Sequence, residues 1–264
     1  MLSGFFQDIR TGTRLLARSP GFTLIAVLSL GIGIGANTAP FSFADGLLLR
    51  PMPVPDASEV LAVGSINVTI GTGDPQLRAS YADYADLRAA SESFAGLAAF
   101  EDIPVQFAMG PDTTPEIRTA TLVSGNFFAV MGIEPALGRA FRPDEDEVPG
   151  RDAVAVLSHR FWERGLASDP DVLGRRVRLN GTEFTVIGVA PEKFTGVDLF
   201  VRPDLYVPLM IWPTLLGSDQ PSPLERRDQR VLEVKGRLRD GVTLEQAGAD
   251  VARIGAELAQ EYPA

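Results

Sequence analysis

Residues 19–44 read SPGFTLIAVLSLGIGIGANTAPFSFA and carry no formal charge over twenty-six positions. At about 1.5 Å of rise per residue, a helix over most of this run would cross the roughly 30 Å hydrocarbon core of a bilayer. Ser19 before Pro20 is typical of an N-cap followed by proline at the first helical position. The sequence therefore predicts a transmembrane helix at 19–49, with everything after it on one side of a membrane.

The flanks of this run predict its orientation. Arg10, Arg14 and Arg18 precede it four residues apart, which suits a short amphipathic helix at residues 3–18 on the membrane surface. After the run, Arg50 is the one basic residue before Arg78. By the positive-inside rule, we expect segment 1–18 in the cytoplasm and the remainder on the extracytoplasmic side of the membrane.

Three other interpretations of the run compete with a retained anchor. A cleaved signal peptide has the same basic start and apolar centre, but residues 36–40 (ANTAP) make a poor small-x-small cleavage site. A buried helix of a soluble protein rarely lacks charge over such a length. Residues 31–36 satisfy G-x-G-x-x-A, yet an apolar helix-like run precedes them and Pro40 would disrupt the helix that a dinucleotide site needs. We favour the anchor, with the signal peptide as its main alternative.

Two glycines in the run suggest a membrane partner. Gly31 and Gly35 form a G-x-x-x-G face, where missing side chains let a neighbouring transmembrane helix approach closely. A lipid-facing surface gives no comparable reason for glycine. We therefore expect contact with membrane lipid and with a neighbouring transmembrane helix that this chain does not contain.

Composition excludes several function classes for the remainder. Residues 51–264 hold 32 acidic and 20 basic side chains, a net charge of −12 that should repel nucleic acid. The chain has no cysteine, so neither a disulfide framework nor a thiolate metal site can form. The length after Arg50 is enough for one large or two small domains.

Local patterns predict an α+β domain after the membrane helix. We expect strands at 60–63, 105–109, 117–123, 153–157, 177–189, 204–208 and 232–239. Asn180-Gly181 accommodates the positive φ of a type I′ turn, so the strands on either side should pair directly. Helix caps are expected at Ser80, Ser124 and Ser158, and Thr243 with Gln246 makes a capping box. The apolar spacing after Thr243 predicts an amphipathic helix that packs within the domain, with a coiled-coil stalk as the alternative.

The residues indicate no catalytic, cofactor-binding or metal-binding site. The chain lacks the phosphate-loop motif G-x-x-x-x-G-K-[ST], so it is not a P-loop ATPase. His159 is the only histidine and is expected in a packing or surface role. The acidic run 144–147 lacks the spacing of a calcium loop and is expected to be solvated. Ser80 and Ser158 lie outside any G-x-S-x-G elbow, which argues against an enzyme.

Many short motifs of this chain stand in the same order as similar motifs in one known family. The first are LLARSPGFT at 15–23, GIGANTA at 33–39, LLRP at 48–51 and SYADY at 80–84. The later ones are NFF at 126–128, GIEPALGR at 132–139, LS and FW within 157–162, LNG at 179–181 and IGVAP at 187–191. The first set resembles the start of the MacB/FtsX-type ABC transporter permeases, especially their duplicated orphan branch. The second set is similar to their periplasmic core domain.

The resemblance implies a two-part α/β periplasmic domain at 50–264. It consists of a porter-like part at about 56–114 and 211–264 and an inserted subdomain at about 115–210. The chain would be a membrane-anchored permease component, and a fragment, of an ABC-type export or mechanotransmission system in the bacterial inner membrane. A separate ABC ATPase subunit would hydrolyse ATP, and a periplasmic adaptor protein is a further expected partner.

The sequence departs from the family pattern at two places. Pro40 stands where the family usually has an aliphatic residue, and the chain stops at Ala264, about where a second transmembrane helix should begin. An extracytoplasmic binding or signalling module tethered by one helix, with no role in transport, is therefore the alternative function.

Overall fold

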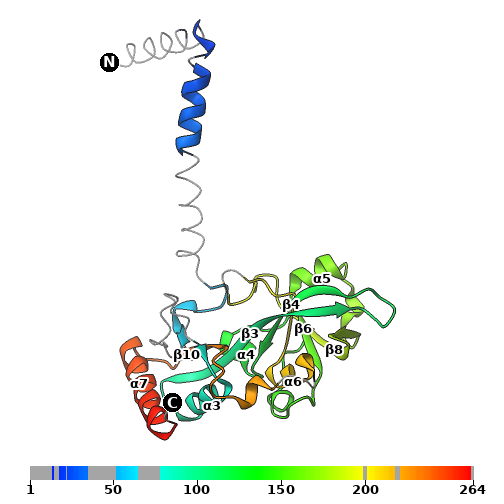
Figure 1. Ribbon diagram of the computed structural model, residues 1–264, viewed down its shortest axis with the longest axis vertical. Coiled ribbons are helices and arrows are strands. Elements are labelled where there is room, and N and C mark those ends of the chain that lie inside the picture. The colour runs from blue at the N-terminus through cyan, green and yellow to red at the C-terminus, as the bar shows by residue number, and fades with distance from the viewer. Residues whose placement is uncertain are drawn as a thin grey trace. The chain divides into compact units, whose positions relative to one another are not determined.

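A computed structural model describes residues 14, 18–21, 23–34, 52–64, 78–198, 201–217 and 221–262. The chain forms two compact units, Met1–Pro51 and Met52–Ala264. In the first unit, residues 20–21 and 23–34 are helical (Figure 1). In the described parts of the chain, no helix is both long and apolar enough to cross a bilayer. Much of the predicted helix at 19–49, with Gly35 and Pro40, lies outside the described residues, so that helix stays a prediction.

The second unit is a mixed α+β domain, which confirms the fold class expected for this part of the chain. Its strands are β1 (Val60–Val63), β2 (Arg78–Ala79), β3 (Phe94–Ala108), β4 (Glu116–Val123), β5 (Leu137–Gly138), β6 (Val154–Leu157), β7 (Arg176–Leu179), β8 (Thr182–Val189), β9 (Leu205–Pro208) and β10 (Leu232–Leu238). Its helices are α3 (Tyr81–Ala90), α4 (Phe127–Met131), α5 (His159–Gly165), α6 (Trp212–Leu216) and α7 (Leu244–Glu261). Short 3₁₀ helices are η1 (Ala57–Glu59), η2 (Pro143–Asp146), η3 (Pro170–Val172), η4 (Leu209–Ile211) and η5 (Pro223–Glu225).

Six of the strands close into a barrel-like ring. β3 pairs with β4, β4 with β9, β9 with β6, β6 with β8, β8 with β7, and β7 pairs back with β3. The β4–β9 and β6–β8 pairs are parallel and the other four are antiparallel. Closure gives every strand of the ring a hydrogen-bonded neighbour on both sides, so that the ring itself has no edge.

Strand β3 is fifteen residues long and belongs to two parts of the sheet. Residues 94–100 pair with β10, which also pairs with β1 and β2, while residues 100–108 belong to the ring. The strand predicted near 105–109 is the last part of β3. The sequence did not predict the first part of β3, because the consecutive residues 97–100 are all buried and hide the alternation of a strand. Pro104 has no backbone N–H to donate to a neighbouring strand. It lies in the stretch 101–106, where β3 pairs with β4 alone among the described strands.

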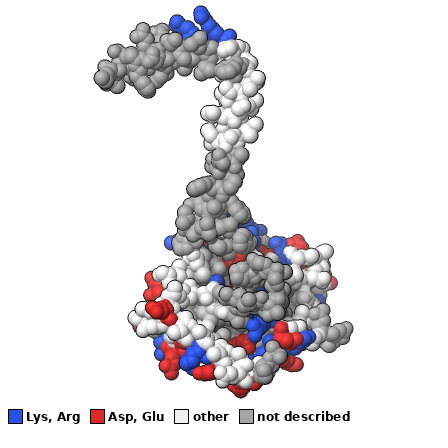
Figure 2. Space-filling view, turned by 60° about the vertical axis from the view of Figure 1, so that its left-hand side comes forward, with Lys and Arg blue, Asp and Glu red and all other residues white. Residues whose placement is uncertain are grey.

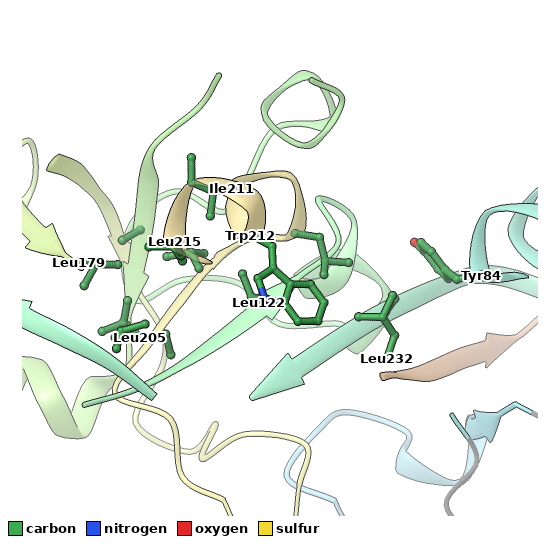
Figure 3. Packing of buried hydrophobic residues seen from close by; sticks show 14 of the residues in the cluster. Tyr84, Leu122, Leu179, Leu205, Ile211, Trp212, Leu215 and Leu232 are labelled. Atoms are coloured by element: carbon green, nitrogen blue, oxygen red, sulfur yellow. The ribbon is translucent and has the colours of Figure 1, made fainter. Parts of the chain in front are cut away.

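Alternate residues of the ring strands fill its interior. The buried set is Val105, Phe107, Ala120, Leu122, Ala155, Leu157, Val177, Leu179, Phe184, Val186, Leu205 and Val207. Ile211, Trp212 and Leu215 from η4 and α6 pack onto this set (Figure 3). From α5, Phe161 packs edge-on against Phe107 with ring centroids 5.0 Å apart. The interior is thus a packed hydrophobic core.

Helices cover both faces of the sheet formed by β1, β10 and the first half of β3. α3 and α7 lie side by side (Figure 1), and their Tyr84 and Ile254 share a hydrophobic cluster with Val234 of β10. α4 supplies Phe127 and Phe128 to a second cluster that includes Phe100 of β3. Because β3 runs through both clusters and the ring, this sheet and the ring form one body within the second unit.

Several local sequence predictions are confirmed. Ser80 and Ser158 each accept the backbone N–H three residues on, at 3.0 and 3.3 Å. Thr243 and Gln246 form both hydrogen bonds of the capping box at the start of α7. The backbone turns at Asn180-Gly181 with φ of 48° and 85°, so β7 and β8 pair directly. Each of these features depends on residues close in sequence.

The prediction that Ser124 caps α4 was wrong. The N-cap of α4 is Asn126. The Ser124 hydroxyl instead accepts the Ala99 N–H at 3.1 Å and donates to Oδ1 of Asn126 at 2.8 Å. The side chain therefore ties the start of α4 to β3 across the sheet.

Leu122 and Ile117 lie on the same strand, β4, and provide a matched test of the ring core. Leu122 is fully buried, whereas Ile117 is 80% exposed. We expect Leu122→Ala to lower the free energy of unfolding by about 2–5 kcal/mol, because it removes a buried side chain and leaves a cavity. Ile117→Ala should change it by less than about 0.5 kcal/mol. Urea unfolding of the full chain followed by circular dichroism measures both, and equal effects would contradict the packed interior.

Candidate functional site

The residues weighed as candidate sites in the sequence have structural contacts in the fold. His159 is half-buried at the start of α5, with its ring 5.4 Å from that of Trp162. In the described part of the chain, no group of three or more histidine, aspartate or glutamate side chains is arranged to hold a metal ion. On the face seen in Figure 2, acidic and basic side chains of the second unit are interspersed. Among the described residues of that face, no large patch of a single charge sign is seen.

The prediction that the acidic run 144–147 is solvated was wrong for two of its four members. Glu145 is buried and accepts hydrogen bonds from the guanidinium of Arg139 at 2.6 and 2.8 Å. Burial acts to raise its pKa, but the bonds from Arg139 and from the Arg142 N–H lower the pKa overall.

Asp146 from the same run joins two distant segments. Its Oδ2 accepts the Gly125 N–H at 2.8 Å, and its Oδ1 accepts the Met210 N–H at 3.1 Å. Burial raises the pKa of Asp146 to about 6 against these hydrogen bonds. The carboxylate holds the turn before α4 against η4, next to the ring.

A first candidate site is the N-terminal junction, which we define as Pro55, Glu59, Val130, Gly132 and Arg237. Arg237 of β10 donates from Nε to the Val130 carbonyl at 2.7 Å and from a terminal nitrogen to the Pro55 carbonyl at 3.1 Å. Its other terminal nitrogen lies 3.4 Å from Glu59. One guanidinium therefore connects the segment before β1, the end of α4 and the sheet.

Glycine at position 132 fits this junction closely. Gly132 ends α4 with a φ of 68°, in the left-handed region that residues with a side chain rarely adopt. A Cβ at this position would lie 3.3 Å from a terminal nitrogen of Arg237. Both the backbone angle and the contact favour glycine here.

Charged groups also gather where β3 passes from the sheet into the ring. Arg78 of β2 donates to Glu101 of β3 at 2.8 Å and lies 3.8 Å from Glu233 of β10. Burial raises the pKa of Glu101 to about 7, although the positive charge of Arg78 acts in the opposite direction. This carboxyl therefore changes charge near neutral pH.

A second candidate site is the outer pocket on the outside of the ring, which we define by Phe100, Asp102, Thr121, Phe127, Asp198 and Tyr206. Val197, Val201 and Pro203 also line the hollow. Asp102 and Thr121 are direct cross-strand partners on β3 and β4, and the Thr121 hydroxyl donates to the Asp102 carboxylate. Burial raises the pKa of Asp102, and the hydrogen bond from Thr121 opposes that rise.

Sequence reasoning missed both sites for identifiable reasons. Arg237 lies at one of the alternate polar positions of β10, so the sequence pattern predicts an ordinary solvent-exposed side chain. Tyr206 lies in a short apolar strand and looks like core. The available signal for the outer pocket was the pair Glu101-Asp102, two adjacent acids in a mostly apolar strand.

The comparisons with known proteins agree on one family. A model of the family "MacB-like periplasmic core domain" matches residues 23–254. The macrolide export ATP-binding/permease protein MacB of Shigella dysenteriae is 25% identical over 198 residues, covering 73% of this chain and 29% of that protein. An uncharacterized ABC transporter permease of Bacillus subtilis, YvrN, is 28% identical over 104 residues, covering 38% of this chain and 25% of that protein. The chain thus spans less than a third of either relative.

Solved structures share the fold. The periplasmic region of MacB from Actinobacillus actinomycetemcomitans superposes with a TM-score of 0.57 at 15% identity, over 79% of this chain and 86% of that chain. The extracellular domain of the noncanonic ABC-type transporter YknZ from Gram-positive bacteria gives 0.52 at 18% identity, over 77% and 92%. At these identities the likeness concerns the fold alone.

Replacing Arg237 tests the N-terminal junction. Arg237→Ala should lower the free energy of unfolding by about 1–3 kcal/mol, because it leaves the carbonyl of the buried residue Val130 without its charged donor and removes the bond to the exposed Pro55. Amide hydrogen exchange of residues 52–59 should become faster. Lys235→Ala, which changes the other basic residue on that side of β10, is the control and should leave both measurements near wild type. Unchanged exchange at 52–59 in Arg237→Ala would show that Arg237 does not hold this segment.

Replacing Glu101 tests its raised pKa. A carboxyl whose pKa is about 7 when folded, above its ordinary 4.5, binds more protons in the folded than in the unfolded state between these values. The free energy of unfolding should therefore fall as the pH rises from about 4.5 to 7. Glu101→Gln should reduce the slope of this free energy against pH. The slope that remains should come from Asp146, whose pKa is also raised. The exposed control Glu116→Gln should retain the wild-type slope. Denaturant titrations across this pH range measure it, and identical slopes in all three proteins would contradict the burial of Glu101.

Proposed function

This chain belongs to the family of the MacB-like periplasmic core domain, and from that premise we propose that it is the extracytoplasmic part of an ABC transporter permease. The observation that carries the proposal is the family match over residues 23–254, which spans nearly the whole of the described α+β unit. All but the first of the motifs that resemble MacB/FtsX-type permeases fall in the same range. Membership of this family supports a role in transport, and we assign the domain no catalytic residue.

The finer proposal concerns the membrane and the partners. We propose that residues 19–49 anchor the chain in the bacterial inner membrane, with 1–18 in the cytoplasm and the α+β unit in the periplasm. Gly31 and Gly35 would face further permease helices. A separate ABC ATPase subunit would supply ATP hydrolysis, since the chain has no phosphate-binding loop motif. A periplasmic adaptor protein is the remaining proposed partner.

Within this role, the fold supports transmission of movement more than carriage of cargo inside the ring. Apolar side chains fill the ring interior. β1 pairs with β10, β10 pairs with β3, and β3 continues into the ring. Arg237 ties the segment before β1 to the same sheet. A displacement of that segment would therefore move the sheet and the ring together.

We further propose a division of the domain that follows these connections. Residues of about 56–114 and 211–264 would form the porter-like part, and about 115–210 the inserted subdomain. On this division, β4, β6, β7, β8 and β9 of the ring come from the inserted subdomain. β3 comes from the porter-like part and completes the ring. The shared strand supports a rigid connection between the two parts.

Cysteine labelling tests the proposed topology, because the chain has no cysteine of its own. Ala252 is exposed on α7, so Ala252→Cys should react with a membrane-impermeant maleimide in intact spheroplasts of a Gram-negative host. Thr11→Cys is the matched control for the cytoplasmic segment, and it should react only after the membrane is permeabilised. The protein should also resist extraction by alkaline carbonate.

The opposite labelling pattern would contradict the proposed orientation. Complete extraction by carbonate would contradict the anchor. Neither result would change the assignment of the family and the fold, because that assignment depends on residues outside segment 1–18.

A further inference from the structure

Helix α7 is attached to the rest of its unit by few apolar side chains. It is eighteen residues long, but Ala247 and Ile254 are its only buried side chains. Val251 and Leu258 pack against the same hydrophobic cluster and are partly buried. Elements with so little apolar burial open at free energies well below that of global unfolding. Polar contacts therefore decide how firmly this helix is held.

Asp250 holds the middle of α7. Its Oδ2 accepts the Ser91 hydroxyl at 3.0 Å and the N–H groups of Glu92 and Ser93 at 3.0 and 3.1 Å. These three donors lie in the turn that joins α3 to β3. Arg253, one helical turn further along α7, donates to Oδ1 at 2.9 Å. The middle of the helix is thus bound to the start of β3.

A separate cluster holds the C-terminal end of α7. We call it the α7 latch and define it as Asp83, Asp86, Arg227 and Tyr262. Arg227 follows η5, and its two terminal nitrogens donate to Asp83 and Asp86 of α3 at 2.7 Å each. Its guanidinium carbon lies 3.8 Å from the centroid of the Tyr262 ring, directly after α7. One side chain therefore joins α3, which lies beside α7 in Figure 1, to the end of α7.

The chemistry of arginine suits this position. A guanidinium donates within its plane to carboxylates and presents its face to an aromatic ring, which a lysine ammonium cannot do in the same way. Arg227 and Asp83 keep 29% and 16% of their side chains exposed, so dissolved salt weakens their attraction. Each contact of the latch joins side chains only, so the latch can open while every strand pair stays intact.

We propose that the α7 latch is a releasable attachment for the C-terminal half of α7. While it is closed, Arg227 positions that half on α3. When it opens, residues 251–262 leave α3 together, and Asp250 keeps the first half of the helix in place. A displacement of the end of α7 therefore reaches α3 only while the latch is closed. This proposal does not depend on the proposed transport function.

Amide hydrogen exchange of the full 264-residue chain tests the proposal. Arg227→Ala should speed exchange at 255–261 about tenfold, because it removes two charged hydrogen bonds and the ring contact. Exchange at 119–123 of β4 is the internal reference and should stay near wild type. Arg226→Ala is the matched control, since that neighbouring arginine donates to Asp228 instead of α3. It should leave both ranges unchanged.

The Arg227→Ala variant should fold, because Arg230 lies 3.7 Å from Asp83 and leaves this carboxylate with a cation nearby. Replacing the ring gives an independent variant at an exposed position. Tyr262→Ala should speed exchange at 255–261 about twofold to fivefold, whereas Tyr262→Phe keeps the ring face and should stay near wild type. Adding Tyr262→Ala to Arg227→Ala should have little further effect, because the two side chains form one contact.

Two results would overturn the proposal. One is unchanged exchange at 255–261 in both alanine variants. The other is an equal acceleration at 119–123 in Arg227→Ala, which would show that Arg227 stabilises the whole unit and not the end of α7.

Discussion

One strand is the constraint on which the structure of the domain depends. β3 supplies seven residues to the sheet with β10 and then continues, without a break, as a wall of the six-strand ring. The ring can close only if β3 reaches β7, and its interior can be filled only if alternate residues of every ring strand are apolar. The apolar character of Val105 and Phe107 on β3 therefore matters to both closure and packing. Helices α3, α4 and α7 then cover the sheet that β3 shares with β10.

Sequence reasoning succeeded where structure is decided locally. Caps at Ser80 and Ser158 and the turn at Asn180-Gly181 depend on neighbours within a few residues, and all are found in the fold. It failed where distant contacts decide. Residues 97–100 are buried on both faces of the sheet, so β3 shows no period of two there, and half of the acidic run 144–147 faces partners such as Arg139 and Gly125. The ring and the outer pocket could not be predicted, because both depend on pairings such as Asp102 with Thr121.

The family assignment and the geometry together give a consistent account of the domain. The packed ring interior argues for a body that moves as a whole, and the N-terminal junction shows how the segment before β1 is attached to that body. Arg237 reaches three backbone or side-chain acceptors from one strand position. The outer pocket lies on the outside of the same ring, where β3, β4 and β9 meet.

The central claim is that the sheet and the ring form one rigid body through β3. Because the chain lacks cysteine, spin labels can be placed at two introduced cysteines, Ala252→Cys on α7 and Arg164→Cys on α5. Pulsed electron paramagnetic resonance then measures the distribution of distances between the two parts. The account predicts one narrow distribution. A broad distribution, or two resolved distances, would contradict it.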